Sequence, residues 1–287
     1  MKIAYCGYDF FGGCLETILE EGHEVIQLFT QAPDNRIRFN DNVRKIAEKN
    51  NIPIYDKKPT EEMIRDLFVN KGCELLISAG FKYIVPTPEG VGFRGANVHP
   101  AMLPVGRGPF PMPVAIYTNE QNYGVSIHEI SSKMDSGDII IQESLTIHPT
   151  EDMDMLCCRC QMLAKKLVKD MLSDFDNYWQ NRIPQSEEKA VYWELPTEED
   201  KTITGNNTVV EADLKVRAFG KYGSIVVADD RVFDVCHASC WKENHIYPTG
   251  KIIHTSTNEM VISLKDGFIC LRYFKELVKN ENDYVEQ

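Results

Sequence analysis

The chain has 287 residues, 43% of them hydrophobic and 26% charged, which is ordinary for a soluble globular protein with two modest domains or one large one. Its formal net charge of -12 disfavours a large polyanionic partner such as a nucleic acid, unless basic side chains gather in one area. The nine cysteines are an odd number, and the sequence shows no export signal, so we expect reduced thiols in a cytoplasmic protein. No apolar run has the length of a membrane span, so no membrane partner is expected.

Short apolar strands and amphipathic helices alternate through the N-terminal part. Strands are predicted at residues 2–6, 24–30, 52–55 and 74–79. The helical stripes between them end at Gly22, Asn51 and Gly72. This alternation predicts an α/β fold with a mostly parallel sheet and helices on both faces. The turn Gly7–Gly13 after the first strand does not have the GxGxxG pattern, so no dinucleotide site is inferred from it.

The side chains best suited to chemistry lie between residues 97 and 141. Asn97 and His99 are two positions apart on a predicted extended segment, so their side chains project on the same side. Asp135 follows the predicted strand 124–130 in a tight Asp-Ser-Gly turn. An amide, an imidazole and a carboxylate together suit acyl transfer to an amine. The imidazole accepts the amine proton, the amide donates to the developing oxyanion, and the carboxylate orients the imidazole.

Each of these residues taken singly also has a structural interpretation. An asparagine near a strand end or an Asp-Ser-Gly sequence is usually a turn former. A lone histidine more often makes a structural hydrogen bond than takes part in a reaction. The functional interpretation depends on their occurrence together with the loop Leu103-Pro104-x-x-Arg107-Gly108.

Three motifs occur in one order along the chain: Asn97-x-His99, then Leu103-Pro104-x-x-Arg107-Gly108, then Met134-Asp135-Ser136-Gly137-Asp138. With them the chain resembles the folate-dependent formyltransferase superfamily. That group includes methionyl-tRNA formyltransferase, glycinamide ribonucleotide formyltransferase and the sugar N-formyltransferases. The resemblance covers residues 1 to 180 and continues more weakly into the C-terminal part.

The resemblance implies a Rossmann-like catalytic domain that takes the formyl group from 10-formyltetrahydrofolate and needs no metal. His99 is expected to accept the proton of the attacking amine and Asn97 to hydrogen-bond the oxyanion. Asp135 is expected to orient His99 and to help move the proton to the leaving folate nitrogen.

The resemblance also implies which loops bind the two substrates. The segment after the fourth strand and the loop before Asp135 are expected to form opposite walls around the pterin ring, with candidate contacts at Phe81, Tyr83, Ile84, Val85, Ser132 and Met134. The loop after the first strand faces the formyl acceptor in the superfamily, and an arginine near the site suits a diphosphate. The candidate acceptor contacts are therefore Tyr8, Asp9, Phe10 and Arg107, with packing as the alternative for Phe10.

Two other features leave alternatives open. His128 lies on the strand that leads to Asp135, and it either points toward the site or packs beneath it. The cluster Cys157-Cys158-x-Cys160 lacks zinc-site spacing and falls on a helical stripe, while Cys236-His237-x-x-Cys240 lacks a second matching pair. Metal binding is therefore not expected.

We expect a catalytic domain at residues 1–182, a linker at 183–201 and a β-rich domain at 202–287. Pro184, Pro196 and runs of acidic residues indicate the linker. Short strands are predicted at residues 224–228, 231–235, 250–254, 260–264 and 268–274. They suggest a partly open, OB-like barrel, and an exposed β domain of this kind is a common surface for a homodimer.

Charge and size discriminate among formyl acceptors. Methionyl-tRNA formyltransferases carry a basic insertion after the second strand and a basic C-terminal domain. Here that segment offers only Arg36 and Arg38, and residues 188–287 hold 17 acidic against 12 basic side chains. The glycinamide ribonucleotide enzyme is a single compact domain. The expected acceptor is therefore a nucleotide-linked amino-dideoxy sugar rather than a nucleic acid, with methionyl-tRNA as the alternative.

Two further classes share this set of residues or this fold. A non-catalytic folate or sugar-nucleotide binding module would keep the fold, but it would need none of Asn97, His99 and Asp135. A formyl-folate hydrolase would use similar residues with water as the acceptor, and it would release formate without any amine.

Overall fold

The structure, a computed structural model, describes residues 1–32 and 39–277. The chain forms two compact units. Unit 1 comprises Met1–Pro111, Asn122–Thr146 and Cys157–Glu194, and unit 2 comprises Met112–Gln121, Ile147–Leu156 and Leu195–Gln287. The predicted linker therefore contributes its first residues, 183–194, to unit 1. The division into a catalytic domain, a linker and a C-terminal domain stays a prediction.

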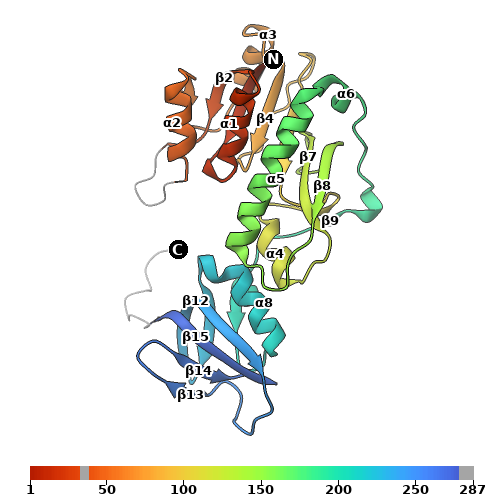
Figure 1. The fold of residues 1–287 in the computed structure, drawn as a ribbon. Coiled ribbons are helices and arrows are strands. Elements are labelled where there is room, and N and C mark those ends of the chain that lie inside the picture. The colour runs from red at the N-terminus through yellow and green to blue at the C-terminus, as the bar shows by residue number, and fades with distance from the viewer. Residues whose placement is uncertain (33–38, 278–287) are drawn as a thin grey trace. The chain divides into compact units, whose positions relative to one another are not determined.

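A seven-stranded sheet with the order β3-β2-β1-β4-β5-β7-β8 forms the centre of unit 1 (Figure 1). Its strands are β1 Lys2–Gly7, β2 Glu24–Phe29, β3 Ile54–Tyr55, β4 Leu75–Ala79, β5 Gly95–His99, β7 Tyr123–Glu129 and β8 Ile139–Leu145. The pairings from β3 across to β5 are parallel. The pairings of β5 with β7 and of β7 with β8 are antiparallel. The predicted α/β fold with a mostly parallel sheet is confirmed.

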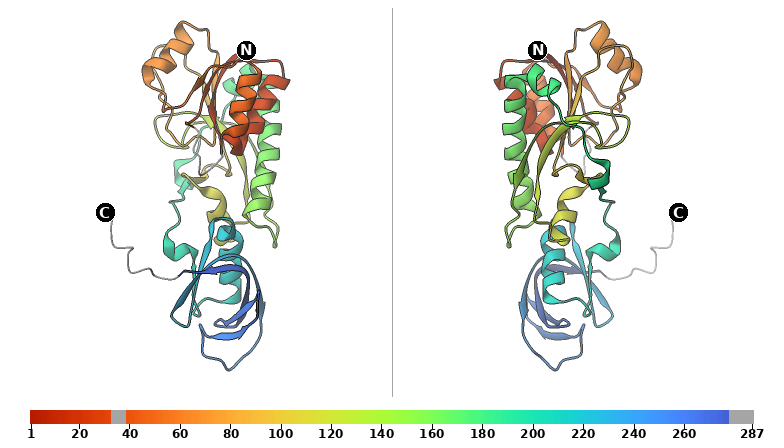
Figure 2. Two further views of the ribbon diagram at one scale, coloured as in Figure 1. Left: turned by 90° about the vertical axis from the view of Figure 1, so that its left-hand side faces the viewer. Right: turned by 90° about the vertical axis from the view of Figure 1, so that its right-hand side faces the viewer.

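Helices cover both faces of this sheet (Figure 2). On one face lie α1 (Gly12–Glu20), α2 (Asp41–Lys49) and α5 (Met153–Ser173), and on the other lies α3 (Glu61–Val69). The chain runs from β1 through β2 to β3 and then returns to the far side of β1 at β4. Because such crossovers are right-handed, this reversal puts α3 on the opposite face.

The α3 side of the sheet shows how the sequence builds this layer. Thr60 caps α3 by accepting a hydrogen bond from the backbone N–H of Met63, three residues on. Ile64 and Leu67 then pack into a buried core with β-strand side chains, which include Ala4, Cys6 and Leu76. The shorter elements of unit 1 are η1 Asp9–Phe11, β6 Val105–Arg107, α6 Phe175–Gln180, η2 Glu187–Lys189 and β9 Val191–Tyr192.

Unit 2 is built on a six-stranded sheet with the order β10-β11-β12-β15-β14-β13. Its strands are β10 Thr202–Ile203, β11 Ser224–Ala228, β12 Arg231–Lys242, β13 Ile252–Thr255, β14 Met260–Ser263 and β15 Gly267–Glu276, and its helices are α4 Pro111–Tyr117, α7 Glu198–Lys201, α8 Val209–Phe219 and η3 Gly220–Tyr222. The predicted β-rich C-terminal part is confirmed. Among the described strands the pairings run from β10 to β13 without a pair that closes the sheet, so an OB-like barrel is not confirmed.

Helix α8 adds to the predicted strands and forms much of the core of unit 2. It begins with a capping box, in which the side chains of Thr208 and Glu211 each accept a hydrogen bond from the other's backbone N–H. Val209, Ala212 and Val216 pack from α8 against the sheet, and the buried side chains of the sheet in this core include Val226, Phe233, Val235, Met260, Ile262, Ile269 and Leu271. The Thr-x-x-Glu spacing is the sequence signal for this helix.

Loss of the Phe233 ring is expected to destabilise unit 2. Phe233 is completely buried, so Phe233→Ala removes a large apolar side chain and leaves a cavity that costs about 3–5 kcal/mol of unfolding free energy. Denaturant unfolding measures this change. Val210→Ala, at an exposed position of α8, is the control and is expected to change the value by less than about 0.5 kcal/mol. Equal effects of the two changes would contradict this description of the core.

Two general expectations can be compared with the structure. All nine cysteines lie within the described residues, and all are free thiols. Among the helices in residues 1–32 and 39–277, none combines the length and the apolar character that crossing a membrane requires.

Candidate active site

Strand β5 positions two of the three predicted catalytic side chains. It lies between β4 and β7, with Asn97 opposite His128 and His99 opposite Ser126 on β7. Asn97 is half-buried and His99 is buried. Because the two residues are separated by one position on a strand, their side chains lie on the same face of the sheet.

Asp135 reaches this face from the loop between β7 and β8. Its Oδ1 lies 3.4 Å from Asn97 Nδ2 and 3.7 Å from His99 Nδ1, and its Oδ2 accepts a hydrogen bond of 2.9 Å from the backbone N–H of Gly108. Its φ of 51° is in the left-handed region, which aspartate tolerates better than most residues. The structure therefore brings Asn97, His99 and Asp135 together, as the sequence predicts.

The tautomer of His99 follows from its hydrogen bond to the backbone. Nε2 lies 2.8 Å from the carbonyl oxygen of Gly106, which can only accept, so Nε2 carries the hydrogen. Nδ1 of the neutral ring then has a free lone pair and is the nitrogen that faces Asp135. A proton taken up at Nδ1 would make an imidazolium held between the Asp135 carboxylate and the Gly106 carbonyl.

The pKa values of the pair favour a neutral base beside an ionised acid. Burial lowers the pKa of His99 from its ordinary value of 6.5, and the opposing effect of Asp135 is smaller. Burial alone would raise the pKa of Asp135, but the neighbouring His99, His128 and the Gly108 N–H outweigh it and lower the pKa to about 2. At neutral pH His99 is thus able to accept a proton, and Asp135 is able to stabilise the resulting charge.

His128 belongs to the same group of side chains. Its Nδ1 donates to the carbonyl of Glu129 at 2.8 Å, so in the neutral ring Nε2 is an acceptor. Nε2 lies 3.1 Å from Asn97 Nδ2 and 3.4 Å from Asp135 Oδ1. Of the two alternatives for His128, the structure supports the one in which it points toward the site. The sequence signal is its pairing position opposite Asn97, which only the antiparallel register of β7 defines.

Arg107 is held by two side chains, Gln185 and Glu187. Its side chain is 8% exposed, and its Nε, Nη1 and Nη2 all donate to Gln185 or Glu187. In this structure the guanidinium therefore has a structural role, and its binding of a diphosphate stays a prediction. The sequence could not show that partners 78 and 80 residues away occupy it.

The loop after β1 is also used internally. The carboxylate of Asp9 accepts hydrogen bonds from the backbone N–H groups of Asn42 and Val43 at the start of α2, and its contact with an acceptor substrate stays a prediction. Tyr8 is buried, and burial raises its pKa to about 12. The ring of Phe10 packs edge-on against that of Phe11, with 4.3 Å between the ring centroids, which agrees with a packing role for Phe10.

The residues predicted to contact the formyl donor divide into accessible and buried ones. Val85 is buried among core side chains of the α3 layer, and its contact with the formyl donor stays a prediction. Phe81 and Tyr83 are half-buried with their rings 5.4 Å apart. In the second loop Ser132 is exposed, and the hydroxyl of Tyr192 donates to the sulfur of Met134. The large hydrophobic side chains exposed in these loops are Ile84 and Met134.

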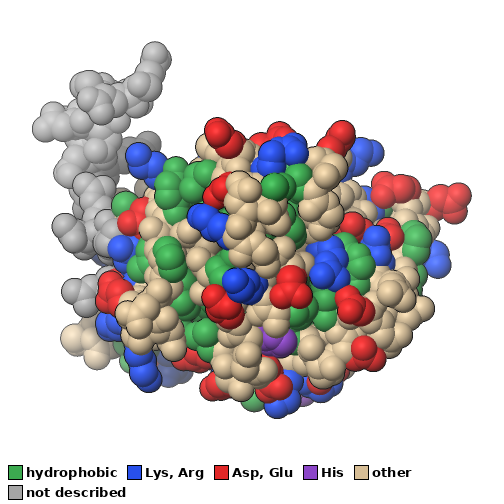
Figure 3. Space-filling model, turned by 90° about the horizontal axis from the view of Figure 1, so that it is seen from above, with side chains coloured by type: hydrophobic (Ala, Val, Ile, Leu, Met, Phe, Trp, Pro, Cys, Tyr) green, Lys and Arg blue, Asp and Glu red, His purple; other side chains and the backbone are tan. Residues whose placement is uncertain are grey.

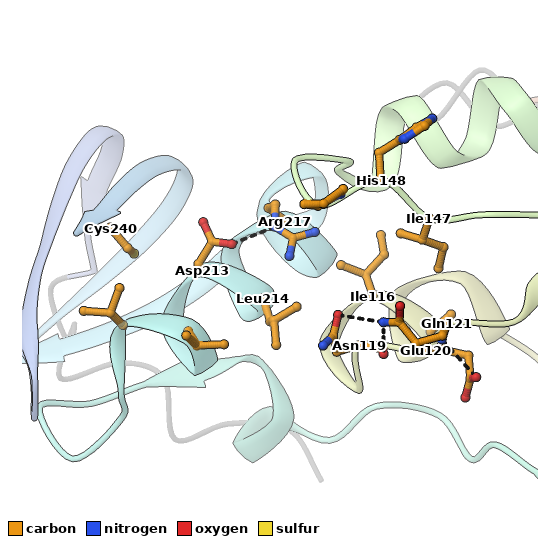
Figure 4. Close-up of a pocket in the computed structure, with 14 residues that line it drawn as sticks. Ile116, Asn119, Glu120, Gln121, Ile147, His148, Asp213, Leu214, Arg217 and Cys240 are labelled. Carbon is orange, nitrogen blue, oxygen red and sulfur yellow. Dashed lines mark hydrogen bonds and ion pairs between the residues drawn. The ribbon is translucent and has the colours of Figure 1, made fainter. Parts of the chain in front are cut away.

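A separate pocket of about 470 Å³ lies within unit 2 (Figure 4). Arg217 and Asp213 of α8 form an ion pair on one side of it, and the turn Asn119–Gln121 lines another side. None of the predicted site residues lines it.

Within the described part of the chain, no group of three or more His, Cys, Asp or Glu side chains is arranged to hold a metal ion.

Comparison with known proteins identifies the family. The family model described as formyl transferase matches residues 1–172, which is more than half of the chain. The chain belongs to the formyl transferase family. It is an N-formyltransferase that uses a folate formyl donor. The resemblance seen in the three motifs is thereby confirmed.

Relatives of this formyltransferase differ in their acceptors. The methionyl-tRNA formyltransferase of Lactobacillus gasseri is 26% identical over 277 residues, which cover 93% of this chain and 87% of that protein. The N-formyltransferase of Helicobacter canadensis, solved in complex with folinic acid and dTDP-3-aminofucose, has a TM-score of 0.73 at 20% identity and covers 96% of this chain and 99% of its own. The sugar 3N-formyltransferase WlaRD, solved with dTDP and 5-N-formyltetrahydrofolate, has a TM-score of 0.72 at 21% identity. The match covers 98% of this chain and 99% of WlaRD.

Proposed function

We propose that this formyltransferase moves the formyl group of 10-formyltetrahydrofolate to the primary amine of a nucleotide-linked amino-dideoxy sugar. The observation that carries the proposal is the neutral His99, whose free Nδ1 lies beside an ionised Asp135 and next to the amide of Asn97. A proton acceptor, a counter-charge and an amide donor in one place are what attack by an amine on a formyl group requires.

The proposed reaction forms one C–N bond and breaks another. The donor supplies an electrophilic formyl carbon, which the neutral amine attacks. His99 accepts the amine proton at Nδ1, and the imidazolium is stabilised by Asp135 and by the carbonyl of Gly106. The proton then passes to the folate nitrogen as that nitrogen leaves. Proton transfer of this kind contributes about 10²- to 10⁴-fold to the rate.

Asn97 is the proposed donor to the oxyanion. Its Nδ2 carries two hydrogens, and in the structure His128 Nε2 and Asp135 Oδ1 lie within reach of them. The contact to His128 is the shorter, at 3.1 Å against 3.4 Å. We infer that His128 holds the amide and that the hydrogen with the longer contact, near Asp135, is the one that donates to the oxyanion during the reaction, at a benefit of about 3 kcal/mol.

The proposed donor site uses the accessible residues of two loops. Phe81, Tyr83 and Ile84 after β4, with Ser132 and Met134 between β7 and β8, offer half-buried rings and exposed apolar groups. A flat heterocycle fits such surfaces, with backbone groups of the loops as its polar partners.

Charge supports a small acceptor. Of the residues from 188 to the end of the chain, 17 are acidic and 12 basic, which opposes the binding of a tRNA. On the face shown in Figure 3, Lys and Arg side chains alternate with Asp and Glu rather than gathering into one basic area. Arg36 and Arg38, the two basic residues that the segment after β2 offers to a tRNA acceptor, lie outside the described residues. The likeness in fold to two sugar N-formyltransferases over almost their full length also supports this acceptor.

Methionyl-tRNA is the second candidate acceptor, favoured by the identity to the Lactobacillus gasseri protein over 93% of the chain. A mass-spectrometric assay separates the two. The protein is incubated with 10-formyltetrahydrofolate and, in separate tubes, with dTDP- or UDP-linked amino-dideoxy sugars, with charged methionyl-tRNA, or with water alone. We expect one formyl group on a sugar nucleotide. Formylated methionyl-tRNA, or free formate without any amine, would overturn the proposal.

The ionisation of His99 gives a test that does not need a substrate. Because burial lowers its pKa, the midpoint of His99 in the folded protein should lie below its ordinary value of 6.5, and the ring should be mostly neutral at pH 7. NMR titration of the imidazole, assigned by comparison with His99→Gln, measures the midpoint. A midpoint above 6.5 would contradict the effect of burial, and a midpoint well above 7 would show a mostly charged ring and exclude His99 as the proton acceptor at neutral pH.

A further inference from the structure

Residues 183–193, called the strap below, pack against the two loops that carry the site. Ile183 exchanges two backbone hydrogen bonds of 2.8 Å with Ile139 at the start of β8. Farther along, β9 pairs in parallel with β6, and the backbone N–H of Trp193 donates to the carbonyl of Arg107 at 2.7 Å. The strap therefore touches both the loop before β8 and the loop around Arg107.

Gln185 connects these two loops through one side chain. Its Nε2 donates to the backbone carbonyls of Asp135 at 2.9 Å and of Gly137 at 2.7 Å. Its Oε1 accepts from Nε of Arg107 at 3.1 Å and from Nη2 of Arg107 at 3.0 Å. Both hydrogens and both lone pairs of the carboxamide are thus used, which leaves the group one orientation.

The residues next to Arg107 act directly on the candidate catalytic side chains. The carbonyl of Gly106 accepts the hydrogen of His99 Nε2, and the N–H of Gly108 donates to Asp135 Oδ2. A side chain at Gly108 would place its Cβ 2.2 Å from the carbonyl oxygen of Trp193, so the strap lies directly against this loop. The position of Arg107 therefore sets the positions of two groups that hold His99 and Asp135.

Glu187 is the less important partner of Arg107. It accepts from Nη1 at 3.2 Å and from Nη2 at 2.8 Å, and Arg107 lowers its pKa. Its side chain is 69% exposed, however, whereas that of Arg107 is 8% exposed. An exposed carboxylate contributes little through such a pair. Gln185 is the partner that also reaches the Asp135 turn.

We propose that Gln185 is a positioning residue for formyl transfer. It holds the Asp135–Gly137 turn directly and the Gly106–Gly108 loop through Arg107, and so keeps both at the distance from His99 that proton transfer needs. This inference rests on the proposed function. The turn needs such support because Asp135 has a left-handed backbone conformation, which costs energy and persists only where the surrounding structure fixes it. A shift of this turn changes the distance between the carboxylate and His99, and with it the geometry for proton transfer.

Two substitutions at Gln185 separate the donor role from a simple anchoring of Arg107. Gln185→Met keeps the size and removes all four hydrogen bonds. Gln185→Glu keeps two oxygens for Arg107 but loses both donors to Asp135 and Gly137. We expect each change to lower kcat by about 10- to 10²-fold with KM values little changed, because misplaced groups slow the reaction more than they weaken binding. Glu188→Gln, at an exposed position of the same strap, is the control with wild-type kinetics.

The titration of His99 provides the readout that a merely structural role would not move. The groups that face His99 are Asp135, His128 and the Gly106 carbonyl, and Asp135 raises its pKa. In Gln185→Met, which leaves the net charge unchanged, a displaced carboxylate should lower the NMR midpoint of His99. A partly unfolded sample would lower kcat without moving that midpoint. If Gln185→Met does not fold, Gln185→Asn, with the same amide one methylene shorter, takes its place in both measurements.

Two results would overturn the inference. One is wild-type kcat in Gln185→Glu, because anchoring of Arg107 would then suffice. The other is an unchanged His99 midpoint in the folded methionine or asparagine variant. If the wild-type protein itself formylates no amine, the proposed function fails, and the His99 midpoint alone then decides whether Gln185 positions the turn.

Discussion

His99→Gln is expected to lower kcat for formyl transfer by about 10²- to 10³-fold or more. The glutamine side chain is polar and of similar reach, but it cannot take up the amine proton. In the wild-type protein Nδ1 is the nitrogen of His99 that can accept this proton, because Nε2 already donates to Gly106. The KM for the donor should change little, since the lost interaction is made mainly in the transition state.

Steady-state kinetics with the formylated product measured by mass spectrometry gives this loss directly. His254→Gln, the same substitution at an exposed position of β13, is the matched control and should leave kcat unchanged. A His99→Gln protein that is folded and retains most of its kcat would show that another group, or the solvent, accepts the proton.

Asp135→Asn is expected to lower kcat by a similar factor and also to lower the pKa of His99. The carboxylate raises the pKa of His99, so its neutral replacement should move the NMR midpoint of the imidazole to still lower pH. The rate falls because the imidazolium formed during the reaction loses its counter-charge in a buried site, which costs about 10²-fold or more. The fall in kcat and the shift of the midpoint should therefore occur together.

The control for this change lies in the same motif. Asp138→Asn alters a carboxylate that is half-buried and 3.9 Å from Arg182, and it should affect neither quantity strongly. A higher His99 midpoint in Asp135→Asn would contradict the assigned electrostatics. Wild-type kcat in the same protein would remove Asp135 from the reaction.

Local patterns in the sequence were sufficient to predict the sheet and the convergence of three side chains. Strand–helix alternation in the N-terminal part predicts parallel strands with helices on both faces, whereas the order of the strands is known only from the structure. Asn97 and His99 share a face because side chains on a strand repeat every two residues. Asp135 meets them because its turn follows the strand next to β5.

The contacts that the sequence did not reveal depend on long-range register. His128 is directed into the site by the antiparallel pairing of β5 with β7, which puts it opposite Asn97. The sequence predicts Arg107 to be a free cation near the site, but its partners Gln185 and Glu187 lie in the strap, which only the fold brings next to it. Val85 follows directly on loop residues that are accessible, yet it is turned into the core against α3. No local pattern distinguishes these outcomes.

Competition between the two candidate acceptors tests the central claim most directly. The protein is mixed in one tube with 10-formyltetrahydrofolate, equal concentrations of a dTDP-linked amino-dideoxy sugar and methionyl-tRNA, and the formyl group in each product is counted by mass spectrometry. With the wild-type protein we expect the formyl group on the sugar nucleotide. With His99→Gln we expect almost no formylated sugar nucleotide. Formyl groups found on methionyl-tRNA instead would contradict the proposed acceptor, and transfer that persists in His99→Gln would contradict the proposed site.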